Sequence, residues 1–314
     1  MKERIKILIA GANGFVGRTL VDFFNNDLTM KSVGIQFDMF PATRREIDFS
    51  DPEAMSSFYD AFGFFDVVIN CAVKNSRGKH KKSWSDIETN LQIETNLKSF
   101  KPELYFDFSS GAGTYEDRID PYSVFKRLSL SNIANTQDGQ VSFLLFGCIG
   151  LLEESDRFFK KAFHTALDGD TMHIQEKFMD FTWIDDVCKV LRNIILISFS
   201  DHFADENFFP LRGENVLFYP HISNLLSNIY DEVQGFCGTH APTDLDSSLM
   251  SVLNSYSYYT LTGRSAALSR MGIRAPKGMK NKFEYILSLT GDEPLTKQDI
   301  YHNMLEKVLK ERDE

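Results

Sequence analysis

The segment "IKILIAGANGFVGRTL" (residues 5–20) decides the fold of this 314-residue chain. Apart from Lys6, its first six residues form an apolar run rich in isoleucine, which is typical of a strand buried on both faces of a parallel sheet. Three glycines at three-residue intervals follow, and the next residues, "RTLVDFFNN" (18–26), carry apolar side chains at helical spacing. Strand, glycine turn and helix in this order predict the start of a βαβ unit.

The glycine turn predicts a binding site for a dinucleotide. Glycines let the backbone turn sharply and approach a pyrophosphate, and the N-terminus of the following helix offers free N–H groups with positive partial charge. The alternative is a glycine-rich turn without a ligand, and the preceding strand together with the βαβ order favours the nucleotide. The residues expected to line the cofactor here are Gly11, Asn13, Gly14, Phe15, Val16 and Gly17.

Strands and helices alternate through the first 150 residues. This order predicts an α/β fold with a Rossmann-like, doubly wound parallel sheet. We expect residues 1–150 to form a dinucleotide-binding domain, rejoined by a strand, turn and helix at about 179–200. Residues 151–314 are expected to form mainly a smaller C-terminal substrate-binding lobe and a last surface helix. After the first strand, further strands are expected at 32–37, 66–73, 104–110 and 141–150, and helices at 51–62, 85–100 and 121–136.

Composition excludes several classes of function. The chain has 44 acidic and 34 basic residues, and a net charge of −10 repels polyanions, so we expect no nucleic-acid partner. The uncharged apolar run at 141–152 is too short to span a bilayer, and no signal peptide is expected. Four scattered cysteines without a CxxC motif predict reduced thiols, a cytoplasmic protein and no metal site.

The ribose of the cofactor needs a partner near the end of the second strand. Asp38 is expected there and would accept from the ribose hydroxyls of NAD. Arg44, with Arg45 beside it, would instead pair with the 2′-phosphate of NADP, unless both lie in a solvated loop. Asp48 is placed to reach the adenine edge. The sequence therefore leaves NADP or NAD open.

The stretch "IDPYSVFKRL" (119–128) places Tyr122 and Lys126 four residues apart. On a helix this spacing puts both side chains on one face, about 6 Å apart along the axis. An ammonium group beside a phenol favours the phenolate and so makes the phenol a better proton donor and acceptor near neutrality. Because the spacing alone is a weak signal, it gains weight only from a nucleotide site around it.

Several motifs in one order make the chain resemble the extended short-chain dehydrogenases/reductases, of the nucleotide-sugar epimerase/dehydratase/reductase kind. These motifs are "GANGFVG" (11–17), "DVVINCAV" (66–73), "FDFSSGAGTY" (106–115), "PYSVFK" (121–126) and "MDFTWIDDV" (179–187). The part of the chain after them resembles the family only loosely.

The resemblance implies roles for single residues. Tyr122 would be the acid/base, Lys126 would tune it and bind the nicotinamide ribose, and Ser110 would orient the substrate oxygen, with Ser109 as the alternative. Asn90 matches an asparagine of the family, although a surface polar residue is an equal alternative. Further cofactor contacts are expected at Phe49, Cys71 and Ala72. The expected substrate contacts are Ser110, Gly111, Arg157 and Arg212, with Lys160, Lys161 and Arg264 as further candidates and ordinary surface charge as the alternative for each basic residue.

Two departures from the family pattern bear on the reaction. Tyr122 stands only twelve positions after Ser110, where the family usually has a spacing roughly twice as long, so the site is expected to be more open. Gly111 and Ala112 stand where the related 4,6-dehydratases carry an Asp-Glu pair, which argues against dehydration.

The short link from the second strand to "EIDFSDPEAM" (46–55) resembles that of the 4-keto-6-deoxysugar reductases. The first interpretation is therefore an NAD(P)H-dependent reductase of a nucleotide-diphosphate 4-keto-(6-deoxy)sugar in surface-polysaccharide biosynthesis. The alternatives are a nucleotide-diphosphate-sugar 4-epimerase with tightly bound NAD and a non-catalytic regulatory protein that binds the cofactor. The resemblance also implies a homodimer, assembled through the helices at 85–100 and 121–136.

Overall fold

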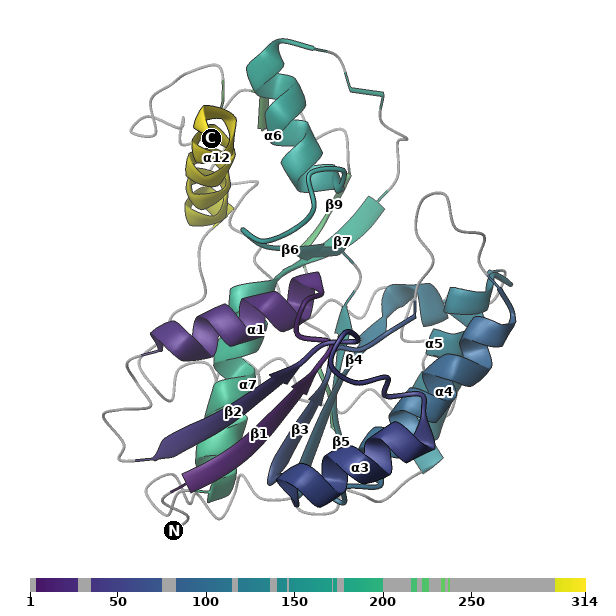
Figure 1. Cartoon of the computed structure of the whole chain (residues 1–314). Coiled ribbons are helices and arrows are strands. Elements are labelled where there is room, and N and C mark those ends of the chain that lie inside the picture. The colour runs from purple at the N-terminus through teal and green to yellow at the C-terminus, as the bar shows by residue number, and fades with distance from the viewer. Residues whose placement is uncertain are drawn as a thin grey trace.

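A computed structural model describes most of the first 200 residues and the C-terminal helix (Figure 1). The described residues are 4–27, 35–74, 83–114, 118–135, 140–145, 147–170, 172–173, 178–199, 216–218, 222–225, 233–234, 237 and 297–314.

A six-stranded parallel sheet forms the centre, in the order β2-β1-β3-β4-β5-β8. The chain first winds from β1 outward to β2 and then, from β3 on, outward in the other direction. This reversal beside β1 defines the predicted doubly wound, Rossmann-like α/β fold, which is confirmed. The strands are β1 (Arg4–Ala10), β2 (Gln36–Ala42), β3 (Val67–Asn70), β4 (Leu104–Ser110), β5 (Gln140–Leu145) and β8 (Val216–Phe218).

Helices cover both faces of this sheet (Figure 1). Because side chains alternate along a strand, Ile7 and Ile9 of β1 pack in one apolar cluster and Leu8 in another. The first cluster includes α1 (Phe15–Asn26) and α7 (Ile184–Phe199), and the second includes α3 (Pro52–Phe62) and α4 (Ser85–Lys98). The helix α5 (Pro121–Asn135) packs beside α4.

A smaller group of elements lies beyond the carboxyl ends of the main strands (Figure 1). Its sheet has the order β6-β7-β9, with β6 (Gly147–Ile149), β7 (Phe178–Trp183) and β9 (Ile222–Leu225). The helices α6 (Phe158–Asp168) and α12 (Lys297–Asp313) pack on each other. Their shared apolar cluster includes Phe163, Trp183, Met304 and Val308. The division of the chain into residues 1–150 and 151–314 stays a prediction.

The prediction of one strand at 141–150 is wrong, because the chain changes sheets within it. Leu145 of β5 pairs with Ser110, the last residue of β4, so the main sheet offers no further partner along that side. Residues 147–149 instead pair with β7. The segment at 179–200 is likewise divided, since β7 joins the small sheet and only α7 returns to the main one.

The second strand also differs from the expectation of residues 32–37. It runs from Gln36 to Ala42 and pairs with all seven residues of β1. Asp38 and Pro41 are poor strand formers, which made the sequence signal end too early. Because β2 is an edge strand, Pro41 is tolerated there. Among the helices that the structure describes, none has the length and apolar character needed to cross a membrane.

Candidate active site

The glycine turn after β1 lies between the carboxyl ends of β2 and β3 and contacts the chain on both sides. The N–H groups of Gly11 and Ala12 donate to the carbonyl oxygen of Ala42, at 2.9 and 3.1 Å. On the other side, a Cβ atom at Gly11 would lie 2.7 Å from the Cα atom of Ala72. Gly11 also has a φ of +80°, so only glycine fits this position without strain.

The start of α1 fits a pyrophosphate. A Cβ atom at Gly14 would meet only the carbonyl oxygen of Gly11, at 3.4 Å, so packing does not require glycine here. Its missing side chain leaves room above the turn, and no side chain caps the helix that begins at Phe15. The first N–H groups of a helix have no partner within it, so this end attracts an anion.

The structure moves Asp38 away from this turn. Asp38 lies in the middle of β2, opposite Lys6, and pairs with Arg4 near the amino end of the sheet, at 2.5 Å. At 3.3 Å per residue it stands roughly 13 Å before the end of the strand at Ala42. The expectation that Asp38 ends the second strand is therefore wrong, and no geometric reason remains to place it at the ribose.

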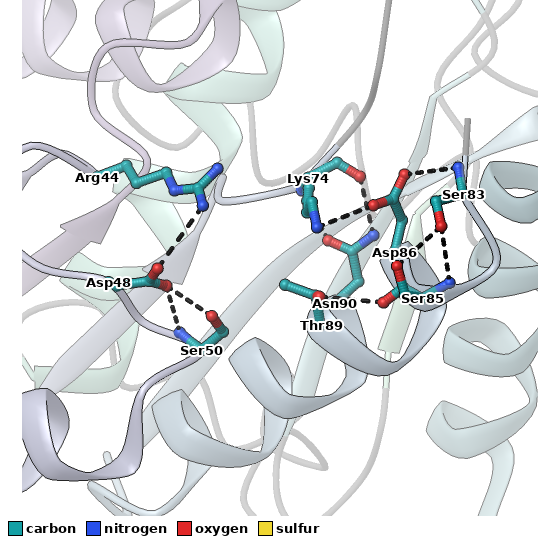
Figure 2. A network of polar contacts seen from close by, with 9 residues as sticks. All are labelled: Arg44, Asp48, Ser50, Lys74, Ser83, Ser85, Asp86, Thr89 and Asn90. Atoms are coloured by element: carbon teal, nitrogen blue, oxygen red, sulfur yellow. Dashed lines mark hydrogen bonds and ion pairs between the residues drawn. The ribbon is translucent and has the colours of Figure 1, made fainter. Parts of the chain in front are cut away.

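Arg44 stands beyond the end of β2 instead (Figure 2). Its Nη2 atom lies 3.7 Å from Oδ2 of Asp48; the side chain of Arg44 is largely exposed, and that of Asp48 is half-buried. The hydroxyl and the N–H of Ser50 donate to Oδ1 of Asp48, at 2.6 and 3.0 Å. Phe49, the neighbouring predicted contact, is buried in the sheet core.

Asn90 holds the segment that follows β3 (Figure 2). Its side-chain oxygen accepts from the N–H of Lys74 at 2.7 Å, and its Nδ2 donates to the carbonyl oxygen of the same residue at 3.0 Å. Asn90 is 2% exposed, so the alternative of a surface polar residue is wrong. The Nζ atom of Lys74 lies 3.0 Å from Oδ1 of Asp86.

Tyr122 and Lys126 lie on successive turns of α5, as predicted. The Nζ atom of Lys126 donates to the carbonyl oxygen of Phe108 in β4, at 2.7 Å, and its side chain is buried. Tyr122 is half-buried, and its hydroxyl makes no hydrogen bond to any residue in the described ranges.

Ser110 is brought to the same place by the turn after β4. Residues Gly111–Thr114 form a short 3₁₀ helix that packs directly on α5, since a Cβ atom at Gly113 would lie 2.8 Å from the carbonyl carbon of Lys126. The hydroxyl of Ser110 accepts from the N–H of Ala112 at 3.2 Å. Ser109 is 3% exposed, and its hydroxyl has no partner within the described part of the chain. Because Ser110 is more accessible than the buried Ser109, it is the better candidate for the serine that orients the substrate oxygen.

A family model of the "NAD dependent epimerase/dehydratase family" matches residues 7–196, well over half of the chain. The chain belongs to this family. It is an NAD(P)-dependent enzyme of the extended short-chain dehydrogenase/reductase type, as the motifs predicted. No curated protein sequence matches the chain significantly.

Solved structures share the fold of this family member at low identity. The GDP-mannoheptose C4 reductase of Campylobacter jejuni with NADP bound has a TM-score of 0.55 and 15% identity, covering 87% of this chain and 99% of that one. A GDP-L-fucose synthetase of Naegleria fowleri bound to NADP has a TM-score of 0.59 and 12% identity, covering 98% of this chain and 95% of that one. The GDP-D-glycero-L-gluco-heptose synthase of Campylobacter jejuni in the presence of NADPH has a TM-score of 0.60 and 14% identity, covering 99% of each chain.

Sequence reasoning missed a layer of buried polar groups behind Lys126. Glu94 of α4 is 6% exposed and accepts from the hydroxyl of Ser129 at 2.7 Å. Asp107 of β4 is buried and accepts from the hydroxyl of Ser142. Burial, and after it the charge of Asp107, raises the pKa of Glu94, while Lys126 lowers it. An acidic residue inside the apolar run "LYFDF" (104–108) was the available signal.

The predicted substrate cations are only partly placed. Arg157 stacks over the ring of Phe15 at 5.0 Å and donates to the carbonyl oxygen of Cys148 at 3.2 Å. It therefore braces the segment after β6 against the first turn of α1. Lys160 is buried and pairs with Glu311, at 2.7 Å. Lys161 is exposed on α6, whereas Arg212 and Arg264 lie outside the described residues.

The remaining predicted contacts lie at the turn. Ala72 abuts Gly11, and Cys71 is half-buried, with its N–H bonded to the carbonyl oxygen of Ala10 at 2.9 Å. Burial raises the pKa of the Cys71 thiol, so the thiol stays neutral and packs as a small apolar side chain.

A pocket of about 340 Å³ between α3 and α4 is lined by none of the predicted site residues. Among the described residues, no three His, Cys, Asp or Glu side chains converge as metal ligands would.

Proposed function

We propose that the protein reduces the 4-keto group of a nucleotide-diphosphate 4-keto-(6-deoxy)sugar. The observation that carries this proposal is that α5, which bears Tyr122 and Lys126, packs on the turn directly after Ser110, and that the ammonium group of Lys126 bonds to β4. Pathways that make surface polysaccharides would use such a product.

Each residue has a distinct task in this reaction. The hydroxyl of Ser110 would donate a hydrogen bond to the keto oxygen, and the phenol of Tyr122 would give that oxygen its proton. Lys126 places a positive charge one helical turn away, which stabilises the phenolate left behind. When bound, the reduced nicotinamide supplies the hydride for the carbon atom, so the ketone becomes an alcohol and the cofactor is oxidised.

Several solved structures with this fold support a reductase. They include a GDP-mannoheptose C4 reductase and a GDP-6-OMe-4-keto-L-xylo-heptose reductase, both of Campylobacter jejuni. We infer a nucleotide-diphosphate sugar as the substrate class, with Arg157 and Arg212 as candidates near its diphosphate. The sugar and the nucleobase follow from the assay below.

The test is NADPH and NADH oxidation with a panel of GDP-, UDP- and dTDP-4-keto-6-deoxysugars. The wild type should turn over at least one member, and Tyr122→Phe should lose roughly a hundredfold or more in kcat, since general acid catalysis contributes about 10² to 10⁴. Tyr59→Phe on α3 is the matched control, because it removes the same atom from another half-buried tyrosine.

Two results would contradict the reductase. Stoichiometric NAD that survives purification, with interconversion of two sugar epimers and no net oxidation, would show the 4-epimerase. Cofactor binding without any turnover, unchanged in Tyr122→Phe, would show a regulatory binding protein.

A further inference from the structure

The lobe formed by β6, β7, β9, α6 and α12 contacts the rest of the chain at the first turn of α1. A Cβ atom at Gly150, just after β6, would lie 3.1 Å from Cζ of Phe15 and 2.4 Å from Cγ2 of Ile184. Phe15 is the first residue of α1, and Ile184 is the first residue of α7. The backbone at Gly150 therefore packs directly on both helices, at the end of α1 where the pyrophosphate is expected.

Two arginines, one from each side, strengthen this contact. The Nη2 atom of Arg18 in α1 donates to the carbonyl oxygen of Leu152 at 3.0 Å. In the opposite direction, the guanidinium group of Arg157 stacks over the ring of Phe15 at 5.0 Å and donates to the carbonyl oxygen of Cys148 at 3.2 Å. Arg18 thus reaches from α1 to the lobe, and Arg157 reaches from the lobe to α1.

On the lobe side, buried hydrogen bonds carry this contact into α6 and α12. The N–H of Glu153 donates to the carbonyl oxygen of Gly150 at 3.1 Å, and its carboxylate accepts from the N–H of Lys160 at 2.9 Å. The ammonium group of Lys160 lies 2.7 Å from Oε1 of Glu311 in α12. Because Glu153 and Lys160 are both buried, a shift of residues 150–152 against α1 would displace the lobe as one unit.

We propose that Arg18 is a positioning residue for hydride transfer, because it fixes the lobe that binds the sugar on the helix that binds the cofactor. This inference rests on the proposed function, in which the nicotinamide belongs to the main sheet and the sugar to the lobe. Hydride transfer needs the reacting atoms about 3 to 3.5 Å apart, and a misplacement of about 1 Å can cost roughly a hundredfold in rate. Arg18 acts on this distance through the carbonyl oxygen of Leu152.

The first test is a single-turnover measurement, in which the absorbance of bound NADPH is followed after mixing with the sugar nucleotide that the wild type reduces. Arg18→Gln should lower the rate constant of hydride transfer roughly tenfold or more and leave the Kd for NADPH within about twofold. Arg18→Lys keeps a cationic donor and should recover part of that loss. A variant that is only less stable would lose amplitude and keep the rate constant.

The second test needs no sugar. Hydrogen exchange of the full-length protein, followed by mass spectrometry, reports on residues 147–163 when NADPH binds. NADPH should protect this segment and the start of α1 in the wild type, whereas Arg18→Gln should keep the protection of α1 and lose most of that at 147–163. The matched control is Arg312→Gln, which removes an arginine that pairs with Asp168 at 2.6 Å within the lobe and should behave as the wild type.

An unchanged single-turnover rate constant in Arg18→Gln, or equal protection of residues 147–163 in the wild type and this variant, would overturn the role of Arg18 and leave the reductase standing. A wild type that binds NADPH and reduces no sugar nucleotide would contradict the proposed function. The exchange experiment would then still decide whether Arg18 docks the lobe on α1.

Discussion

The glycines of the turn serve three different physical needs. Gly11 needs a positive φ and no side chain against Ala72, and Gly17 lets α1 pack on the turn, since its Cβ atom would lie 2.9 Å from the Cα atom of Ala12. A side chain at Gly14 would meet little of the protein, so this glycine serves to leave open the space beside the turn and the start of α1. The sequence spacing alone does not reveal this division.

Alanine substitutions should separate folding from binding. Gly17→Ala should destabilise the protein by about 1 to 3 kcal/mol, because neighbouring backbone must move. Gly14→Ala should cost less than about 1 kcal/mol of folding free energy and yet weaken NADPH binding at least about tenfold, because its methyl group occupies the space above the turn. Urea unfolding and NADPH fluorescence titration measure the two effects. Equal losses of stability in both variants would contradict this division.

At the scale of elements, α4, α5 and β4 enclose the buried charges behind the acid/base pair. The charge of Lys126 acts on the buried carboxylate of Glu94, which accepts from the hydroxyl of Ser129, and the buried carboxylate of Asp107 accepts from the hydroxyl of Ser142. Along α5, Ser129 lies one turn after Lys126 and Tyr122 lies one turn before it. Removing Lys126 takes away one of the positive charges that favour the ionised form of Glu94.

Lys126→Met should therefore destabilise the fold by about 1.5 to 3 kcal/mol, the usual contribution of a hydrogen bond from a charged group, because it removes the buried bond to the carbonyl oxygen of Phe108. Adding Glu94→Gln should recover part of that loss without restoring turnover, since one buried charge disappears and the acid/base pair stays broken. Chemical denaturation of the single and double variants gives the coupling energy. Glu88→Gln, on the exposed face of α4, is the control. Strictly additive effects would show that Glu94 does not respond to Lys126.

A buried acid whose protonation changes near neutral pH precedes α6 and bonds to its first turn. Glu153 accepts from the N–H of Lys160 at 2.9 Å, and burial raises its pKa to about 7. A carboxyl group with a raised folded-state pKa contributes stability that is complete below its unfolded pKa near 4.5 and is lost as the pH rises through 7.

Glu153→Gln imitates the protonated acid, so its unfolding free energy should change less between pH 5 and pH 8 than that of the wild type. Between pH 5 and pH 8, the unfolding free energy of the wild type should fall by about 2 to 3 kcal/mol more than that of the variant, at about 1.4 kcal/mol per pKa unit. Thermal or urea unfolding across this range measures it. Glu154→Gln removes a neighbouring, exposed carboxylate and should leave the wild-type slope intact.

Sequence periodicity located these elements where local signals agree with tertiary pairing. The cap of α3 is an example, since Asp51 accepts from the N–H of Glu53 at 2.9 Å as expected of an N-cap residue before proline. Sequence periodicity gave wrong strand bounds in β2, where pairing with β1 overrides the poor strand propensity of Asp38 and Pro41. It also missed the end of β5 at Leu145, which is set by the end of the neighbouring strand β4. Which polar side chains are buried, as with Asn90 against the backbone of Lys74, depends on packing between segments far apart in sequence.

At the scale of the whole molecule, the predicted homodimer depends on α4 and α5. Leu130 packs inside the chain, whereas Leu128 on α5 is 41% exposed. Only Leu128 therefore remains available to a second copy on that turn.

If two copies pair through these helices, Leu128→Asp should shift the protein to monomers, since it would bury a charge in the contact. Light scattering coupled to size-exclusion chromatography measures the mass. Leu309→Asp, at a similarly exposed leucine on α12, should leave it unchanged. A monomeric wild type, or a dimer that persists in Leu128→Asp, would rule out this interface.

The packing of α12 on α6 also sets the order of events during synthesis on the ribosome. Phe163 and Trp183 are made early, but the cluster that shields them includes Met304 and Val308. Until roughly 120 further residues have been translated, these aromatic side chains lack their cover, at a stage when incomplete domains are prone to aggregate. The first strands of the main sheet can therefore pair in the nascent chain before the apolar cluster between α6 and α12 is complete.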